Sequence, residues 1–285
     1  MDVFGYEFMQ RAFWAGGMIG IIGPLLGVYL MLRRQVLMAD TLSHVSLAGV
    51  ALGSVLRLNP ALSGFAVAVA GGIIIEQLRR SYRTYSELPV AIIMTSGLAL
   101  AVVLMSLRQN LSKSFSSYLF GSIVAVSGTQ LKLIALVTAA GLIYFTVLRR
   151  PLYSLTFDEE TAGISGVRTG LLSFSFAVLT GMTVAAAMPV VGVLLVSALI
   201  VLPASIALRL ASGFTAAILI AVSTGLLGVF SGLTASYYIN TPPGGTIALI
   251  LLLFLLAAIS LQKLARLKRR RRQYRSPLHS RDTVN

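Results

Sequence analysis

Apolar residues gather along this chain in runs of roughly twenty, and short polar or charged stretches separate the runs. A run of about 20 apolar residues is the length that an α-helix needs to cross the hydrocarbon core of a bilayer. The pattern therefore predicts an all-α, polytopic membrane protein with about nine transmembrane helices. The expected spans are 12–32, 36–56, 61–78, 88–107, 131–148, 170–187, 190–208, 214–238 and 246–261.

The stretch between residues 108 and 130 does not follow this pattern. It is mostly polar, although the residues from Tyr118 to Val126 are largely apolar. So short a run cannot span the bilayer, and irregular backbone at membrane depth is tolerated only where protein surrounds it. We expect a half-helix or an interfacial segment here, and eight or ten spans remain alternatives to nine.

The composition excludes a soluble protein. Hydrophobic residues make up 56% of the 285 residues and charged residues only 11%, which is more apolar surface than one soluble core can bury. The chain has no cysteine, so disulfides and thiolate metal sites are excluded. We divide the chain into a transmembrane domain, 1–262, and a basic tail, 263–285, which we expect to be disordered.

The net charge of +14 lies mostly in the loops and the tail, where it predicts contact with anionic lipid and no nucleic-acid binding. Cytoplasmic loops carry an excess of Lys and Arg. With the tail in the cytoplasm and nine spans, the acidic N-terminus and the uncharged loops 187–190 and 240–245 fall outside. Most loop arginines then fall inside: 33, 34, 79, 80, 83, 149, 150 and 209, with Arg57, Arg108 and Lys113 as exceptions.

Asp40 and His44 lie four residues apart within the second predicted span, so a helix presents both on one face. Ionisable side chains are costly in hydrocarbon and usually serve a pathway, a site or a partner. Carboxylate and neutral imidazole are ligands for zinc, manganese and iron, and they also relay protons. Two ligands suit a transported ion, whose remaining ligands would be water, backbone carbonyls or a second copy of the pair. The plain alternative is that the two side chains bond only each other or nearby backbone.

Other residues give weaker evidence of a functional site. Glu76 is close in sequence to Arg79 and Arg80, which is typical of an interfacial ion pair. No Gly-x-x-x-x-Gly-Lys-[Ser/Thr] phosphate loop and no nucleophile with a base stand out. We therefore expect a transport subunit that is not an enzyme, with no permanently bound cofactor and with ATP hydrolysis, where needed, on a separate subunit.

The run Leu32–Gly53 resembles the signature of the zinc, manganese and iron family of ABC-importer permeases. Three further stretches agree in order: 118–124, 157–162 with Gly166, and 201–209. The resemblance implies a type II-like importer permease in the plasma membrane of a bacterium. It implies a homodimer, two cytoplasmic ATPase subunits and an extracellular or periplasmic metal-binding protein. Asp40 and His44 fall on the family positions thought to contact the ion, and the chain is most similar to Gram-positive zinc permeases.

The same resemblance gives the loop after residue 150 a role. Glu160-Thr-Ala162 and Gly166 are similar, in degenerate form, to the Glu-Ala-Ala-x-x-x-Gly signature that contacts the ATPase, although the following Ile-x-Leu-Pro is absent. We expect a short docking helix there, and an ordinary connector is the alternative. The expected coupling residues are Phe157, Asp158, Glu159, Glu160 and Gly166.

Two classes of function remain open from these residues. The first is an importer permease for Zn²⁺, with Mn²⁺ or iron as alternatives, because Asp and His suit zinc and manganese almost equally. The second is a proton-linked secondary metal carrier that uses Asp40 and His44 and transports without an ATPase subunit.

Overall fold

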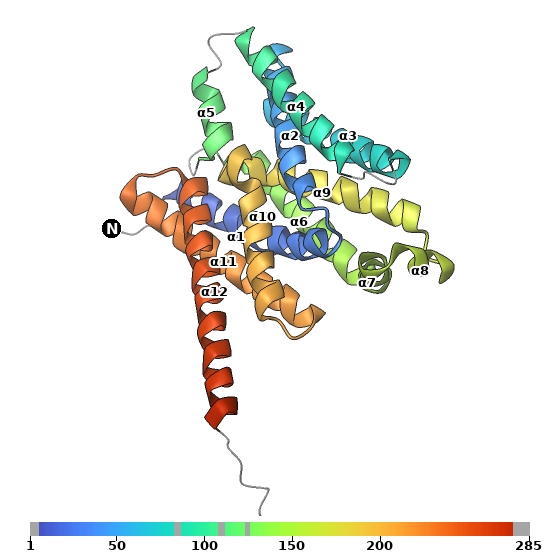
Figure 1. The fold of residues 1–285 in the computed structure, drawn as a ribbon. Helices are drawn as coiled ribbons and strands as arrows, with labels where there is room; N and C mark the ends of the chain where they lie inside the picture. Colours follow the sequence, from blue (N-terminus) through green and yellow to red (C-terminus); the bar gives the residue numbers. More distant parts are fainter. Residues whose placement is uncertain (1–5, 83–86, 108–111, 123–125, 276–285) are drawn as a thin grey trace, which may run out of the picture.

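A computed structural model describes residues 6–82, 87–107, 112–122 and 126–275, and these ranges contain helices and no strand (Figure 1). The helices are α1 (Glu7–Leu32), α2 (Leu37–Val55), α3 (Pro60–Ser81), α4 (Leu88–Ser106), α5 (Ser112–Phe120), α6 (Gly128–Val147), α7 (Arg149–Phe157), α8 (Glu159–Ile164), α9 (Thr169–Val191), α10 (Val193–Leu210), α11 (Phe214–Ile239) and α12 (Pro243–Arg275).

Within the described ranges, eight helices are long and apolar enough to cross a membrane. Helix α2 is a further long helix of 19 residues, and it falls outside that group because Asp40, His44 and several serines lower its hydropathy. Together they account for the nine predicted spans, so the expected all-α polytopic fold is confirmed.

Helix α1 forms the centre of the molecule and packs against α6, α9, α10 and α11. Near its end, the ring of Tyr29 stacks on Phe145 at 4.8 Å and meets Phe214 edge-on at 5.3 Å. Its glycines allow close approach, as small residues do between helices in lipid. A Cβ at Gly27 would lie only 2.0 Å from the carbonyl oxygen of Ile200 in α10.

Helix α2 lies between α3 and α4 and also contacts α9 and α10. Its approach to α3 is set by a glycine, because a Cβ at Gly49 would lie 2.9 Å from the Cα of Gly64. Such close backbone packing fixes the height and rotation of α2, and with them the positions of its polar side chains.

The segment expected at 118–126 differs in its bounds. Helix α5 ends at Phe120 because Gly121 takes a positive φ of 76°, and residues 123–125 lie outside the described ranges. The end of the segment contacts protein, because the N–H of Ser122 donates to the carbonyl of Pro189 at 3.2 Å, while Phe120 is 44% exposed. Its contact is the junction of α9 and α10, where a single residue, Gly192 with φ 88°, separates the two helices.

Helix α12 continues without a break from the last predicted span into the basic tail and extends beyond the other helices in Figure 1. Residues 263–275 belong to this helix, while 276–285, where His279 lies, are outside the described residues, so the expected disorder stays a prediction there.

Several arginine-bearing helix ends meet at one end of the bundle. Arg33, after α1, donates to the Ser173 hydroxyl of α9 at 2.8 Å, and Arg149, at the start of α7, donates to Thr215 of α11 at 2.9 Å. Arg80 of α3 reaches the carbonyl of Thr169 at 3.3 Å. We call this the arginine-rich end, and it also holds α7 and α8.

Candidate functional site

The start of α2 places Asp40 in the first helical turn, where the helix dipole favours a carboxylate. A tight connection from α1 sets this start, because Arg34 has a φ of 57° and the N–H of Gln35 donates to Leu30 at 2.8 Å. His44 follows one turn later on the same face, as the sequence spacing predicts.

Asp40 and His44 face each other without a direct hydrogen bond. His44 Nε2 lies 3.9 Å from Asp40 Oδ2, which is too long for one. The Asp40 side chain is 35% exposed, so neighbouring helices of this chain leave it partly uncovered. The buried Nδ1 of His44 has no partner among the described residues. No direct hydrogen bond therefore joins the two side chains in this structure, and their role stays a prediction.

A third side chain reaches this pair from another helix. The hydroxyl of Ser197, in α10, donates to Asp40 Oδ1 at 3.2 Å and orients the carboxylate. Sequence analysis missed Ser197 because it lies 157 positions further along the chain and belongs to no recognisable motif. The packing of α10 against α2 brings the two together.

The spacing of the pair suits a shared ion. Zinc–nitrogen and zinc–oxygen distances of about 2.0–2.2 Å place two ligands of one tetrahedral ion roughly 3.4 Å apart. The observed 3.9 Å requires only a small side-chain rotation to match. Among the described residues, no group of three or more His, Cys, Asp or Glu side chains could hold a metal. The pair can therefore contact an ion but cannot enclose it.

The expected docking helix is instead two helices, α7 and α8, that meet at Asp158. The backbone of Asp158 is extended, and its carboxylate caps α8 by accepting hydrogen bonds from the N–H groups of Glu160 at 3.0 Å and Thr161 at 3.1 Å. The hydroxyl and N–H of Thr161, with the N–H of Glu160, hold the pKa of Asp158 below its usual value. An N-capping residue interrupts the helix, which the acidic run alone did not reveal.

Gly166 ends this segment. It adopts a positive φ of 83°, its N–H donates to Gly163, and the N–H of Val167 donates to Ala162, both at 3.1 Å. These two hydrogen bonds form a helix terminus that commonly ends in glycine. A residue with a Cβ adopts the required positive φ only under strain. The glycine of the degenerate signature therefore has a structural reason.

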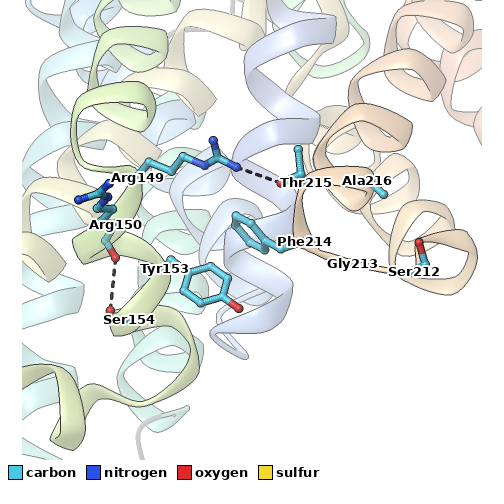
Figure 2. A pocket seen from close by; sticks show the side chains of 9 residues that line it. All are labelled: Arg149, Arg150, Tyr153, Ser154, Ser212, Gly213, Phe214, Thr215 and Ala216. Atoms are coloured by element: carbon cyan, nitrogen blue, oxygen red, sulfur yellow. Dashed lines mark hydrogen bonds between the residues drawn. The ribbon is translucent and has the colours of Figure 1, made fainter.

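Beside α8, exposed aromatic rings form a small cluster. Phe157 is 59% exposed, and its ring lies 4.7 Å from Tyr153, which in turn meets Phe214 edge-on at 5.1 Å. A cavity of about 660 Å³ lies next to these rings, and Figure 2 shows Arg149, Arg150, Tyr153 and Phe214 along it. The surface at this end combines apolar and cationic groups, as protein interfaces often do.

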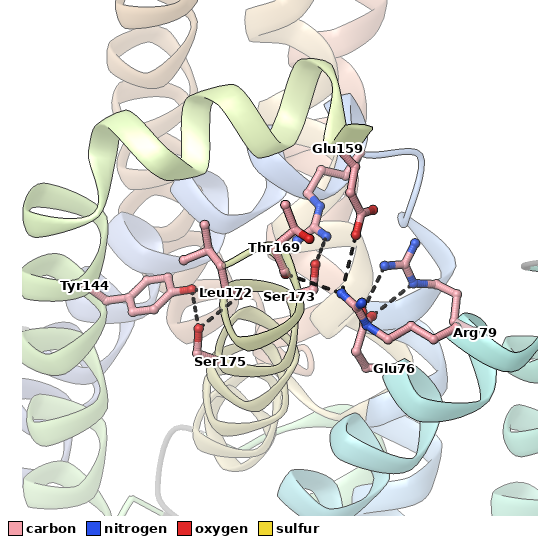
Figure 3. Close-up of polar contacts among 10 residues, drawn as sticks. Glu76, Arg79, Tyr144, Glu159, Thr169, Leu172, Ser173 and Ser175 are labelled. Carbon is pink, nitrogen blue, oxygen red and sulfur yellow. Dashed lines mark hydrogen bonds and ion pairs between the residues drawn. The ribbon is translucent and has the colours of Figure 1, made fainter. Parts of the chain in front are cut away.

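Glu76 forms the expected ion pairs with Arg79 and Arg80, at 2.9 Å each. The surprise is its burial, because the residue is only 1% exposed. Figure 3 shows its carboxylate within a group of polar side chains that extends to Glu159 of α8. Burial lowers the pKa of nearby Arg33 to about 10, which still leaves this guanidinium charged at neutral pH.

Comparison with known protein families shows which family this chain belongs to. The model of the ABC 3 transport family matches residues 5–262. The chain belongs to the ABC 3 transport family. It is thus a multi-pass membrane permease of the ABC transporter class, and the resemblance noted in its sequence is confirmed.

Curated relatives match this ABC 3 family permease along most of its length. A probable metal transport system membrane protein of Treponema pallidum (strain Nichols) is 34% identical over 92% of this chain and 98% of its own length. The high-affinity zinc uptake system membrane protein ZnuB of Haemophilus influenzae is 30% identical, with coverage of 86% and 94%. The manganese import system permease protein ScaB of Streptococcus parasanguinis is also 30% identical, with coverage of 88% and 89%.

A solved structure agrees with the fold of this ABC 3 family permease. PsaBC from Streptococcus pneumoniae, in complex with Fab, matches 90% of this chain and 92% of its own with a TM-score of 0.80 and 28% identity.

Proposed function

We propose that this permease is the membrane-spanning subunit of an ATP-driven importer for divalent transition-metal ions, with zinc as the first candidate. The observation that carries the proposal is the pair of Asp40 and His44, 3.9 Å apart and without a mutual hydrogen bond. The names of the relatives support a metal substrate, and they include both zinc and manganese. Asp and His accept both metals, so manganese or iron is the alternative within the family.

The pair supplies only part of a coordination shell, and this incompleteness suits transport. An ion in transit must bind well enough to enter and weakly enough to leave. We assign the remaining ligands to water and to a second copy of this chain in a homodimer, because the Asp40 side chain stays 35% exposed within one copy. A metal-binding protein on the outer face would deliver the ion.

We assign ATP hydrolysis to two separate subunits, because the sequence contains no phosphate loop. We place their contact at α7 and α8. The exposed Phe157 supplies an apolar anchor beside the cluster with Tyr153 and Phe214. Glu159 and Glu160 begin α8 and would set orientation and association rate through their charge.

We place the arginine-rich end in the bacterial cytoplasm and the N-terminus outside, in accordance with the positive-inside rule. An exposed cysteine replacing Asn240, in the loop before α12, would then react with an impermeant reagent on intact cells. A cysteine replacing Ser165, which follows α8, would react only after lysis. The reverse labelling pattern would contradict this orientation.

The decisive experiment measures zinc uptake into proteoliposomes that contain the permease and its ATPase subunit. Asp40→Asn and His44→Ala should each lower uptake by about a hundredfold, because each removes a direct ligand. Loss of a residue that only hydrogen-bonds a metal ligand already lowers metal affinity or activity by about 10–100-fold. His279→Ala, which alters the only other histidine, is the matched control and should transport normally.

Three outcomes decide between the alternatives. Normal uptake by both site variants would remove the metal role of the pair. Uptake that needs no ATPase subunit would favour the secondary carrier. Competition by unlabelled manganese or iron that exceeds competition by zinc would reassign the substrate within the family.

A further inference from the structure

Glu76 is a buried carboxylate near the end of α3, with its side chain 2% exposed. It accepts three charge-assisted hydrogen bonds: from Arg79 Nε at 2.9 Å, from Arg79 Nη2 at 3.0 Å and from Arg80 Nε at 2.9 Å. A buried charge is stable only when it is paired and hydrogen-bonded in this way. Glu76 therefore holds two guanidinium groups in fixed positions (Figure 3).

Arg80 extends from Glu76 to α8. Its Nη2 lies 3.3 Å from Glu159 Oε1 and also donates to the carbonyl of Thr169, at the start of α9, at 3.3 Å. The guanidinium lies over the ring of Phe174, 5.5 Å from its centroid. Arg80 thus joins α3 to the segment proposed to contact the ATPase.

Arg79 extends from Glu76 in the other direction, to the connection that leads into α2. In the amide orientation that satisfies both groups, the side-chain oxygen of Gln35 accepts hydrogen bonds from Arg79 Nη1 at 3.0 Å and Nη2 at 3.3 Å. Gln35 lies two residues before α2 begins at Leu37 and five residues before Asp40. One carboxylate therefore ties α8 to the start of the helix that carries the metal pair.

The contacts that lead from Glu159 through Glu76 to Gln35 differ in strength. The Arg80–Glu159 pair is partly solvated, with side-chain exposures of 33% and 43%, and such pairs contribute little to stability. The Glu76 carboxylate is buried, and breaking its bonds to the two arginines leaves an uncompensated charge. A movement of α8 would therefore reach Arg80 through the outer contact. The cluster of Glu76 with Arg79 and Arg80 would stay intact and move as a unit with α3.

We propose that Glu76 is a positioning residue that transmits the movement of α8 to α2 and thereby sets the geometry of Asp40 and His44. The proposal rests on the proposed function and deepens it, because it names the mechanical link between ATP hydrolysis and the metal pair. An interfacial anchor would require only bonds to lipid or water. Bonds to both Gln35 and Glu159 through adjacent arginines are what a link between two elements requires.

The test uses the full permease with its ATPase subunit in proteoliposomes and measures zinc taken up per ATP hydrolysed. Glu76→Gln keeps the shape of the side chain and removes its charge. We expect hydrolysis to continue and uptake per ATP to fall by about fivefold or more, the lower bound typical of coupling between sites. The matched control is Glu7→Gln, which removes the exposed ion pair with Arg11 on α1.

A second readout follows α2 directly. The chain has no cysteine, so Leu37→Cys, at the exposed first residue of α2, accepts a single environment-sensitive fluorophore. ATP should change its fluorescence in the otherwise unaltered permease and change it far less with Glu76→Gln. A residue with a purely structural role would lower the yield of folded protein but leave the response of each folded molecule intact.

The outcomes separate this proposal from the function it rests on. Absence of ATP-dependent uptake by the unaltered permease would contradict the proposed function. Normal uptake per ATP and a normal fluorescence response with Glu76→Gln would overturn the link. If Glu76→Gln does not fold, Arg80→Gln is the replacement, since it leaves Glu76 paired with Arg79 and removes the bond to Glu159. Normal coupling in that variant would overturn the link equally.

Discussion

Asp40 and Glu76 are both carboxylates on long apolar helices, and each has an ionisable side chain four residues further on. Their surroundings differ. Glu76 is buried, and Arg79 and Arg80 satisfy it with three hydrogen bonds. Asp40 is partly exposed and accepts one bond from Ser197, while His44 lies 3.9 Å away. The same spacing thus produces a closed cluster in one place and an open pair in the other.

The difference shows what each carboxylate can do. A buried charge with all its partners present cannot release them without a large loss of stability, so it can hold elements together but cannot bind a passing ion. A partly uncovered carboxylate beside an unbonded imidazole gives up little when an ion arrives. Hydrogen-bond satisfaction, rather than sequence spacing, therefore separates the candidate metal contact from the candidate link.

The largest expected effect is on the stability of the folded permease. Glu76→Ala should destabilise the permease by about 3 kcal/mol, because it leaves two guanidinium groups without their buried counter-ion. Asp40→Ala removes only a partly exposed group and should cost less than about 1 kcal/mol. Thermal unfolding of both variants in detergent measures the difference, and equal losses would show that the two carboxylates are not distinguished by their surroundings.

The sequence predicted most of the helices because apolar runs of membrane length are a strong signal. Their exact ends depended on backbone conformations that hydropathy does not report. Gly121 ends α5 earlier than the apolar run suggested, and Gly192 separates α9 from α10 where an uncharged loop was expected slightly earlier. Positive φ angles at these glycines are visible only in the folded chain.

The candidate site was predicted only in its local part. Asp40 and His44 share one helix, so their spacing alone placed them together. Ser197 and Gln35 reach their partners through packing of separate elements, which no local pattern encodes. The burial of Glu76 was missed for the same reason, since its two arginines are local but its cover comes from other helices.

A smaller effect is expected at the arginine-rich end, on binding of the ATPase subunit. Phe157→Ala should weaken association with the ATPase subunit by about 2 kcal/mol, because exposed aromatic anchors dominate interface energies. Metal binding at Asp40 and His44 should not change. Copurification with the ATPase subunit, together with hydrolysis and uptake, measures the effect. Leu171→Ala, which alters another exposed apolar residue, is the control.

Normal assembly and uptake with Phe157→Ala would make α7 and α8 an ordinary connector and place the ATPase contact elsewhere. Glu160→Lys sharpens the test, because a reversed charge should weaken association more strongly at low salt than at high salt.

The smallest expected effect concerns the one hydrogen bond that Asp40 accepts from another helix. Ser197→Ala should raise the zinc concentration for half-maximal uptake by about two- to tenfold, since a hydrogen bond to a charged group is worth about 1.5 kcal/mol and water replaces part of it at this partly exposed site. Ser197→Thr keeps the hydroxyl and should restore affinity. Ser205→Ala, two turns further along α10, is the matched control. An unchanged zinc dependence with Ser197→Ala would mean that Asp40 keeps its orientation without α10, and that α2 alone builds the contact with the ion.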